Sequence, residues 1–587
     1  MGSGSAYGAR SGSDCGFTFV TIFFFMLVQL TIGVSYMFMD SFIKLYTGKA
    51  DLNKNLNPLL KGVAYGLLLQ TLFWTLIHAN DLADAVSYFF NSLKFIPPWS
   101  ICDPKMKKCK ATKDIILQCK LAATSGNKQK QISLNLTSAH HYYESIFHTQ
   151  ERSALTTKFF LIAMVWIINF FFSSVSDLAL IRLFKLMYIL RTLTTIFSTI
   201  FILFALPEFI SIALGDLMNV AAKVSVTETF LQVSYAYGIG VVGLYDFGTL
   251  SPYTCVDNAI LIFTISYTFV SLLRSLVTRI LYLNLRKCVD INIQKGENNT
   301  EDYHYLIFVL LPLAADQLKA SKVFSLYLYS NMMLTLCGHI AAFTLTMSKM
   351  LHSEFKAIKN LYIVGIISFI GCGLSIPVAL GVSYWGGFIN GLNITMVYLG
   401  AIRVAIIMYM YGMKKFCTDI QFWLNFKPTK YWRACWMLMP IILIVSYVLA
   451  LKLAELFQEA FNIRTIPAYA WFCLTLLVIT IIQIKTIVQF IIDNNLSAAF
   501  RSSPKYGPPD ADERKKRKKY EETVNLRICR HACILLDDKF DCNHMPLMRK
   551  DVAEADAEDL SITSIFEAGR AGKYRTSSIM QLPQPYN

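Results

Sequence analysis

Residues 360–402 read NLYIVGIISFIGCGLSIPVALGVSYWGGFINGLNITMVYLGAI, a run without a charged side chain. A helix crosses the hydrocarbon core of a bilayer with about 20 apolar residues, so this run is long enough for two such helices. Small and amide residues interrupt its middle, namely Gly386, Gly387, Asn390, Gly391 and Asn393. We therefore expect a pair of membrane helices joined by a turn near residues 384–393.

Further uncharged runs of suitable length lie on both sides of this stretch. They are residues 15–39, 62–80, 159–176, 192–207, 229–245, 258–273 and 323–348 before it, and 434–451 and 465–484 after it. Together these runs predict about eleven transmembrane helices by length. The sequence shows none of the ~10-residue alternating segments of a membrane β-barrel. The predicted fold class is an all-α polytopic membrane protein.

The composition agrees with this class. Of 587 residues, 55% are hydrophobic and only 16% are charged, whereas an ordinary soluble domain has about 25% charged residues. The net charge of +16 comes from basic residues in short loops and in the tail, as the positive-inside rule predicts. It therefore requires no nucleic-acid partner. The sequence contains neither a phosphate-binding glycine loop after a strand nor a helical zinc motif, so we expect no enzyme and no cofactor.

The polarity of the chain divides it into three parts. Residues 1–14 are a Gly/Ser-rich N-terminus, residues 15–495 form the membrane domain, and residues 496–587 form a soluble tail. Within the membrane domain, residues 97–157 form a large polar loop with Cys102, Cys109 and Cys119 and the glycosylation sequon Asn135-Leu-Thr137. Cysteines and sequons favour an extracellular location. Two weaker sequons begin at Asn298 and Asn393.

The tail contains two clusters that allow alternative interpretations. Residues 514–519 are a block of six basic residues, which either attracts anionic lipid or is a solvated, flexible segment on the cytosolic side. Cys529, His531, Cys533, Cys542 and His544 are spaced loosely. They are either free or lipidated thiols or, less favourably, a small metal site.

One loop motif is specific enough to indicate a family. Residues 411–420 read YGMKKFCTDI, followed by FKP at 426–428 and YWRACW at 431–436. This segment resembles the cytosolic loop between the tenth and eleventh helices of the sodium- and chloride-dependent neurotransmitter symporters. Weaker matches follow in the family's order at residues 61–65, 88–92, 98–102, 135–138, 234–240 and 503–508. The resemblance covers residues 16–508.

The resemblance implies an inverted-repeat symporter fold, with substrate bound near the membrane midplane where the first and sixth helices unwind. Gly238 and Gly240 lie inside the apolar run of the sixth helix, where they indicate either the break or close helix packing. By the resemblance, the candidate substrate-binding residues are Tyr235, Ala236, Tyr237 and Gly238 of the sixth helix and His78 of the third. The family also pairs cysteines in the large loop, which implies a Cys102–Cys109 disulfide with Cys119 as the rival partner.

The sequence departs from the family at its ion sites. The Asp-Ser pair that supplies sodium oxygens in the eighth helix corresponds to His339-Ile340, and sodium prefers oxygen ligands. Ser266 keeps an oxygen at a second sodium position, and the chloride site keeps Ser234 but has Phe25 and Val270 in place of its Tyr and Ser. We therefore expect degraded sodium and chloride sites.

The first-helix motif of the family, Gly-Asn-x-Trp-Arg-Phe-Pro-Tyr, has no match in this sequence. We therefore expect one more N-terminal helix in the native transcript. In the third helix, His78 and Asp81 lie three residues apart on one face, with Asp84 beyond them. They form either a proton-linked site or ordinary pairs with basic neighbours. Because His78 and His339 are titratable, any residual activity is expected to depend on pH between about 5 and 8.

Two functions follow from these features. The first is a secondary transporter for an amino acid or related amine with altered ion coupling, located in the plasma membrane and in contact with membrane lipid. The alternative is a non-transporting family member that acts as an interaction or regulatory protein in the membrane.

Overall fold

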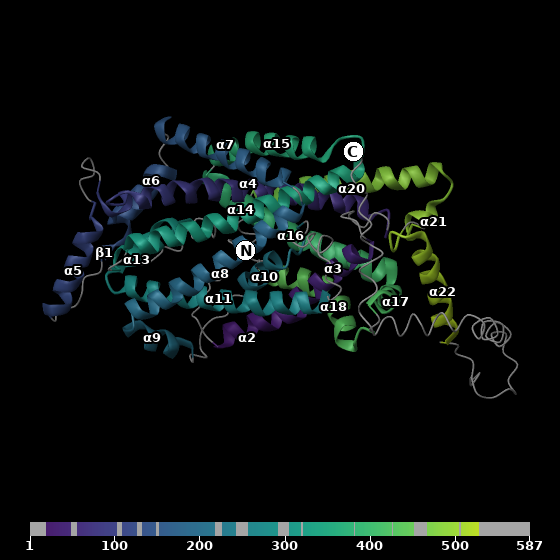
Figure 1. The fold of residues 1–587 in the computed structure, drawn as a ribbon, viewed down its shortest axis with the longest axis horizontal. Helices are drawn as coiled ribbons and strands as arrows, with labels where there is room; N and C mark the ends of the chain where they lie inside the picture. The colour runs from purple at the N-terminus through teal and green to yellow at the C-terminus, as the bar shows by residue number, and fades with distance from the viewer. Residues whose placement is uncertain are drawn as a thin grey trace, which may run out of the picture.

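The computed structural model describes residues 19–47, 56–102, 109–125, 132–147, 152–175, 177–217, 226–241, 256–290, 304–318, 321–380, 382–424, 427–450, 466–503 and 506–527. They form an elongated bundle of helices whose axes run mostly along the molecule (Figure 1). One end carries α5 (Thr112–Ser125), α6 (Ser138–Phe147) and α13 (Leu311–Asp316). The other carries α17 (Met413–Leu424) and α22 (Ala511–Arg527). We refer to these as the α5 end and the α22 end.

The described residues contain nine helices that are long and apolar enough to cross a membrane, which confirms the all-α polytopic fold class. Five of them are α4 (Leu60–Leu93), α7 (Arg152–Ser174), α8 (Asp177–Ala205), α11 (Val256–Arg286) and α14 (Ser321–Glu354). The others are α2–η1–α3 (Phe19–Val28, Gln29–Val34, Ser35–Thr47), α15 (Asn360–Leu380), α16–η6–α17 (Val382–Ala405, Ile406–Gly412, Met413–Leu424) and α20 (Ile466–Ile492).

Nine of the eleven expected runs correspond to these spans. The remaining two correspond to α10 (Val226–Ala236) and α18 (Lys430–Ala450). α10 is short because its helix ends at the predicted break, as described below.

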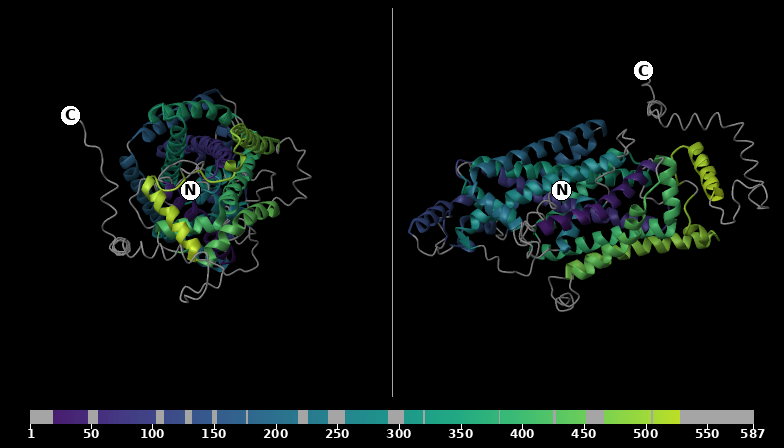
Figure 2. Two further views of the ribbon diagram at one scale, coloured as in Figure 1. Left: turned by 90° about the vertical axis from the view of Figure 1, so that its right-hand side faces the viewer. Right: turned by 90° about the horizontal axis from the view of Figure 1, so that it is seen from below.

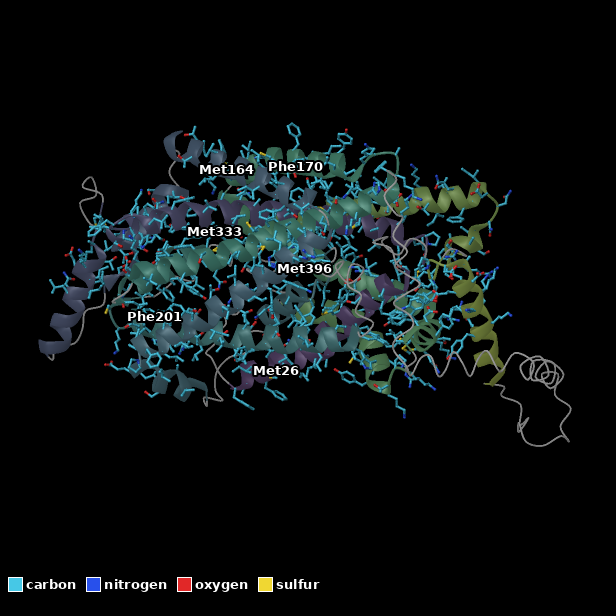
Figure 3. All side chains as sticks on the ribbon, viewed as in Figure 1. Met26, Met164, Phe170, Phe201, Met333 and Met396 are labelled. Carbon is cyan, nitrogen blue, oxygen red and sulfur yellow. A yellow bond between two sulfur atoms is a disulfide. The ribbon has the colours of Figure 1, made fainter. Side chains whose placement is uncertain are left out.

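The helices differ in how deeply they are buried. The most apolar windows of α4 and α14 are 67% and 72% buried, whereas that of α20 is only 17% buried. α4 and α14 pack along each other, and their deep burial places them inside the bundle. The outer helices expose large apolar side chains such as Phe160, Phe204 and Phe369. Figure 3 labels an example of an exposed and of a buried side chain, Met164 and Met396. Apolar groups on the outside are what a lipid-facing surface requires.

The pair of helices in residues 360–402 is present, but the predicted turn is wrong. α15 ends at Leu380 and α16 begins at Val382, so the expected turn residues, from Tyr384 to Asn393, lie inside α16. Membrane helices tolerate glycine in their interiors because small residues allow close packing with neighbours. The glycines of this segment therefore do not mark the turn between the two helices, which only the backbone geometry located.

The break in the sixth helix is present in the backbone. α10 ends at Ala236, and residues 237–240 form a turn in which Gly238 and Gly240 have φ of 66° and 70°. This left-handed region is open to glycine at little cost. A Cβ on Gly240 would lie 1.7 Å from the Met396 carbonyl oxygen of α16. Both interpretations of these glycines therefore hold, since Gly240 is also a close-packing residue.

The large loop is folded against the α5 end. Cys102 and Cys109 form a disulfide, with their Cα atoms 5.7 Å apart. β1 (Ile132–Ser133) pairs in parallel with β2 (Val289–Asp290), which follows α11. Asn135, in η3 (Leu134–Leu136), is exposed. The side chain of the rival cysteine, Cys119, lies outside the described ones.

Further short elements complete this end of the molecule. They are η2 (Pro98–Ser100), α9 (Glu208–Leu217) and η5 (Leu306–Leu310). Ser138 of α6 donates a hydrogen bond to the carbonyl oxygen of Trp99 in η2, at 2.7 Å. This contact holds the two halves of the large loop together.

The tail is not simply a solvated, flexible segment, as one interpretation expected. After α21 (Leu496–Ala499), the basic block at residues 514–519 falls within the helix α22, which lies across the α22 end in Figure 2. Arg517 is only 6% exposed, so this member of the block is packed against the bundle. The N-terminal segment 1–14, the sequon at Asn298 and the Cys/His group at residues 529–544 lie outside the described residues.

Candidate functional site

Side chains from three helices meet beside the break in α10. His78 comes from α4, Tyr235 from the last turn of α10, and His339 from α14. His78 Nε2 and the Tyr235 hydroxyl form a hydrogen bond. The ring centroids of His78 and His339 lie 5.5 Å apart, and those of Tyr235 and His339 lie 6.2 Å apart. The structure thus brings together three residues that sequence reasoning had assigned separately to substrate and ion positions.

Two aromatic residues that the sequence analysis missed complete this group. The ring centroid of Trp74 lies 5.1 Å from that of Tyr235 and 5.9 Å from that of His78. The Phe343 ring lies 6.1 Å from His78 and 6.2 Å from His339. Trp74 precedes His78 by four residues, and Phe343 follows His339 by four, so the i, i+4 spacing could have identified both. We call these five residues the central cluster.

The central cluster is buried but not saturated with hydrogen bonds. His78 and Phe343 are 0% exposed, and Trp74 and Tyr235 are 2% exposed. Within the described part of the chain, neither Trp74 Nε1 nor His78 Nδ1 has a hydrogen-bond partner. Burying a polar group without a partner is unfavourable, above all in a membrane. These two atoms therefore mark a place where a ligand could supply hydrogen-bonding groups.

Ile340, which the sequence analysis placed at a degraded sodium position, lies in apolar packing. Ile340 is 1% exposed and belongs to a hydrophobic cluster with Leu76 and Ala79 of α4 and Ile162 and Trp166 of α7. Its neighbour His339 faces the rings of the central cluster. Neither side chain offers an oxygen, so these residues do not fit a hard cation. Ser266 is half-buried on α11.

Tyr237 lies apart from the central cluster, between η1 and α11. Its hydroxyl donates to Thr264 Oγ1 at 3.1 Å and accepts from Gln29 Nε2 at 2.7 Å. A Cβ on Gly33 of η1 would lie 2.7 Å from the Tyr237 ring, so the glycine makes room for the tyrosine. The tyrosine therefore anchors the break to two helices.

The remaining predicted residues of the break are all inside the bundle. Ala236 is fully buried and Gly238 forms part of the turn. The hydroxyl of Ser234, predicted at the chloride site, is buried and has no hydrogen-bond partner among the described residues.

The two aspartates of α4 have basic partners. Asp84 Oδ1 lies 3.2 Å from Lys158 Nζ of α7, and Asp81 Oδ1 lies 3.0 Å from His304 Nε2. Their carboxylates therefore form pairs with groups toward the α5 end, as the simpler interpretation expected. The central cluster itself contains imidazole and aromatic groups.

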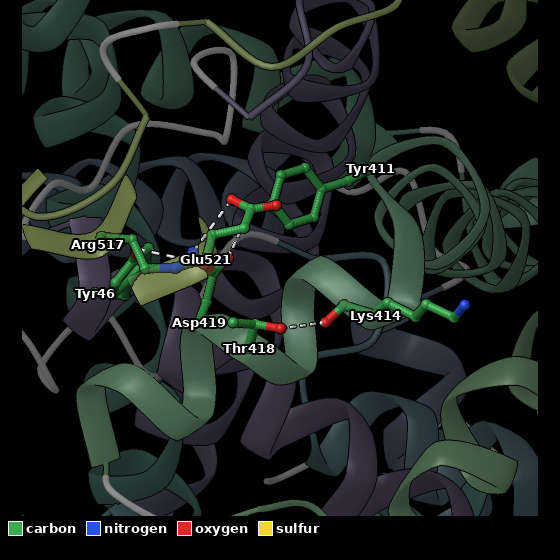
Figure 4. A network of polar contacts seen from close by, with 7 residues as sticks. All are labelled: Tyr46, Tyr411, Lys414, Thr418, Asp419, Arg517 and Glu521. Atoms are coloured by element: carbon green, nitrogen blue, oxygen red, sulfur yellow. Dashed lines mark hydrogen bonds and ion pairs between the residues drawn. The ribbon is translucent and has the colours of Figure 1, made fainter. Parts of the chain in front are cut away.

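A second polar network lies at the α22 end, around Asp419 of α17 (Figure 4). Asp419 accepts hydrogen bonds from Arg517 Nε of α22 at 2.6 Å, from the Tyr411 hydroxyl at 2.5 Å and from the Tyr46 hydroxyl at 3.4 Å. Arg517 also pairs with Glu521 at 3.2 Å. This network attaches the tail helix to the loop that carries the most specific sequence motif.

A further buried ion pair joins α3 to α16. Asp40 pairs with Lys44 at 2.8 Å and with Arg403. The acid is 3% exposed and Arg403 is 4% exposed, so its charge is compensated inside the bundle.

Comparison with known proteins identifies the class and then the family. The chain is similar to a solved structure titled as MhsT in complex with L-phenylalanine, with a TM-score of 0.50 and 13% identity over 76% of this chain and 97% of that one. This similarity shows that the two chains share a helical fold. Residues 11–494 match the model of the sodium:neurotransmitter symporter family. The chain belongs to this family.

Its curated relatives are distant. The sodium-dependent nutrient amino acid transporter 1 of Drosophila willistoni is 22% identical over 73% of this chain and 72% of its own length. The protein of the same name from Drosophila melanogaster is 22% identical over 75% and 74%. At this identity, individual site residues can differ widely.

Proposed function

We propose that this chain is a transporter-like membrane protein that binds an amino acid or related amine at the central cluster. The observation that carries the proposal is the pair of buried atoms without partners, Trp74 Nε1 and His78 Nδ1. When the Tyr235 hydroxyl donates to His78 Nε2, Nδ1 carries the proton of the neutral imidazole. Both atoms are then donors, which matches an acceptor such as a carboxylate oxygen.

The names of the relatives support this ligand class. The Drosophila proteins are named as amino acid transporters, and the similar solved structure is titled as a complex with phenylalanine. The carboxylate that all amino acids share would find the donors of the central cluster. The aromatic rings of Trp74 and Phe343 would favour an apolar or aromatic side chain.

We further propose that sodium and chloride no longer drive this protein as they drive its family. Coupling requires an ion that binds one conformation better than another. His339 and Ile340 offer sodium no oxygen, and Ile340 belongs to the apolar core. The hydroxyls of Ser266 and Ser234 alone cannot surround an ion.

A second candidate function is that of a non-transporting membrane protein that interacts with or regulates others. The observation in its favour is that aromatic and imidazole rings pack closely across the central cluster. A tightly packed centre favours a scaffold over a protein that must open to both sides.

Uptake and binding measurements separate the two candidates. In expressing oocytes we expect no sodium- and chloride-driven uptake of glycine, GABA, monoamines or proline, so replacing sodium with choline should leave uptake unchanged. In purified protein, we expect an amino acid panel to raise the thermal unfolding midpoint. The shift should disappear in His78→Phe and persist in the control Tyr188→Phe, whose ring is exposed on α8.

The outcomes point in different directions. Saturable uptake that vanishes in choline would contradict the loss of sodium coupling. A panel without any thermal shift would contradict the binding site and favour the regulatory function.

We also propose an orientation in the plasma membrane, with the α5 end extracellular and residues 496–587 cytosolic. Asn135 is exposed at the α5 end, where the loop of residues 97–157 carries its disulfide. Glycosidase treatment of protein expressed in cells should reduce its apparent mass, and Asn135→Gln should remove most of that reduction. An unchanged mass would contradict the orientation as well as the glycan.

A further inference from the structure

The tail helix α22 presents a row of lysines on the side opposite its contact with the bundle. Arg517, in the middle of the basic block, is only 6% exposed and pairs with Asp419 of α17. Arg514 donates to the carbonyl oxygens of Pro508 and Pro509. The other four members of the block are exposed, namely Lys515, Lys516, Lys518 and Lys519. At about 100° per residue they spread over about 160°, centred opposite Arg517. We call these four residues the lysine face.

Two acidic residues share this side of α22 by their position in the helix, one at each end of the lysine face. Asp512 lies 3.4 Å from Lys515, with side chains 75% and 78% exposed, and Glu522 follows the last lysine by three residues. Asp510, before the helix, accepts the backbone N–H of Asp512 at 3.2 Å. Among the residues that the structure describes, Lys515 is the one member of the lysine face with an ion pair. Four positive charges against two negative ones leave this side of the helix basic.

The other acidic residues of α22 and α17 are on the bundle side. Glu521 pairs with Arg517 at 3.2 Å, and Glu513 precedes Arg517 by one turn on the same side of the helix. Asp419 is the acidic residue of α17, which packs against α22, and it is bonded to Arg517 and to two tyrosines (Figure 4). Neither helix therefore supplies enough negative charge to neutralise the lysine face.

The sequence beyond the described residues contains a strongly acidic segment. Residues 551–559 read DVAEADAED and contain no basic residue, whereas the nearer acids at residues 537–541 have Lys539 among them. Residues 528–550 connect α22 to this segment. At about 3.3 Å per residue they can reach up to about 75 Å, while Lys519 lies about 12 Å along the helix from Arg527. The connection is therefore long enough for the segment to return to any of the four lysines.

We propose that the acidic segment 551–559 docks on the lysine face of α22 in the same chain. Tethering to the helix gives the segment a high effective concentration at the lysines. An exposed lysine–carboxylate pair contributes at most about 1 kcal/mol, so docking depends on several pairs at once. Because salt screens exposed charges, docking weakens as the ionic strength rises.

The position of α22 favours this segment over anionic lipid, the partner that the sequence also allowed. α22 lies across the end of the bundle (Figure 2), and Arg517 holds one side of it against α17. The lysines on the opposite side therefore point away from the bundle and from the bilayer around it. The inference does not depend on the proposed ligand or on the central cluster.

Carbodiimide cross-linking of the purified full-length protein tests the docking, because this reagent joins a lysine amine to a carboxylate that touches it. Mass spectrometry identifies the joined residues, and the exposed Asp512–Lys515 pair is the internal positive control. We expect cross-links between the lysine face and residues 551–559. Their yield should fall at least about threefold when the ionic strength rises from about 0.05 M to about 0.5 M.

Two variants sharpen the result. In a charge-swap variant, glutamates replace the lysine face and lysines replace the acidic residues of 551–559, and the cross-links should persist with the roles exchanged. The matched control reverses four other exposed lysines at the α22 end and should also retain the cross-links of the lysine face. Its substitutions are Lys414→Glu, Lys415→Glu, Lys427→Glu and Lys430→Glu.

Several outcomes would overturn the inference. One is a wild-type protein in which Asp512 and Lys515 are joined but the lysine face and residues 551–559 are not. Another is an equal yield of cross-links from residues 551–559 to the four control lysines. In a mixture of isotopically labelled and unlabelled protein, cross-links that join the two kinds of chain would identify a second copy as the partner. Cross-links that form in phosphatidylcholine nanodiscs but disappear when phosphatidylserine is included would identify lipid as the preferred partner.

Discussion

The centre of the bundle and its α22 end differ in whether they contain buried ion pairs. At the α22 end, Asp419 is paired with Arg517, and Asp40 is paired with Arg403 and Lys44. In the centre, the central cluster consists of imidazole and aromatic side chains, and His339 packs among the rings. The acids at the α22 end therefore have basic partners, whereas none of the five residues of the central cluster is acidic.

This difference separates folding from coupling. Removing one partner of a buried ion pair destabilises the fold, because the other charge stays buried without compensation. In the proposed function, the central cluster serves to bind a ligand rather than to hold the bundle together. We expect substitutions at the α22 end to affect stability and those in the centre to affect binding.

Breaking the Asp419–Arg517 pair should have the largest effect. Arg517→Ala leaves Asp419, which is 1% exposed, without its cationic partner, and we expect a loss of about 3–5 kcal/mol. Thermal unfolding and limited proteolysis of the tail would detect the loss and the release of α22. The control is Lys515→Ala, since the Lys515 side chain is 78% exposed and should contribute almost nothing. Equal stability of the two variants would show that the tail helix is not held by this pair.

The break in α10 should be nearly as sensitive. Gly240→Ala would place a Cβ against the Met396 carbonyl oxygen at a φ of +70°, and we expect a loss of at least about 2 kcal/mol. The matched control is Gly373→Ala, where nothing lies within 4 Å of the new Cβ. Because Gly373 is inside helix α15, its substitution should be neutral or stabilising by up to about 1 kcal/mol. Similar unfolding midpoints for both variants would contradict the close packing of the break.

Within the central cluster, a double-mutant cycle on His78 and Tyr235 should give a smaller effect. Tyr235→Phe removes the hydroxyl that bonds His78 Nε2, and we expect a loss of about 1–2 kcal/mol, since a buried ring nitrogen loses its partner. The variant His78→Phe and the double variant complete the cycle. A coupling energy near zero would show that the hydrogen bond does not organise the cluster.

The smallest expected effect is a pH dependence at the α5 end. Burial raises the pKa of Asp316 to about 6, against hydrogen bonds from Ser100, Thr112 and Trp99 that lower it. Between about pH 4 and pH 6, Asp316 is therefore protonated in the folded state and ionised in the unfolded state. Stability should increase as pH falls through 6, by about 1–2 kcal/mol.

The comparison of wild type with Asp316→Asn isolates this carboxyl group. The unfolding midpoint of the wild type should rise relative to that of Asp316→Asn as pH falls from 7 to 5, because the amide does not titrate. A constant difference over this range would contradict the raised pKa.

Part of the site could be anticipated from the sequence. The resemblance identified Tyr235 and His78 on separate helices, and the structure joins them by a hydrogen bond. Trp74 and Phe343 escaped notice because an aromatic residue in a membrane helix ordinarily faces lipid or core. Tyr237 was grouped with Tyr235, yet it lies between η1 and α11, because the turn after α10 directs successive side chains to different helices.

Hydrophobic run length and local motifs determined the membrane class and the family, whereas the loss of sodium oxygens at His339-Ile340 stays a prediction. These are local properties that a bilayer imposes on any chain, or that a side chain carries wherever it lies. Only the tertiary structure decided which buried groups meet: the rings of the central cluster, Arg517 on Asp419, and Arg403 on Asp40. Such contacts depend on the rotation of each helix about its axis, which is set by packing against several neighbours at once.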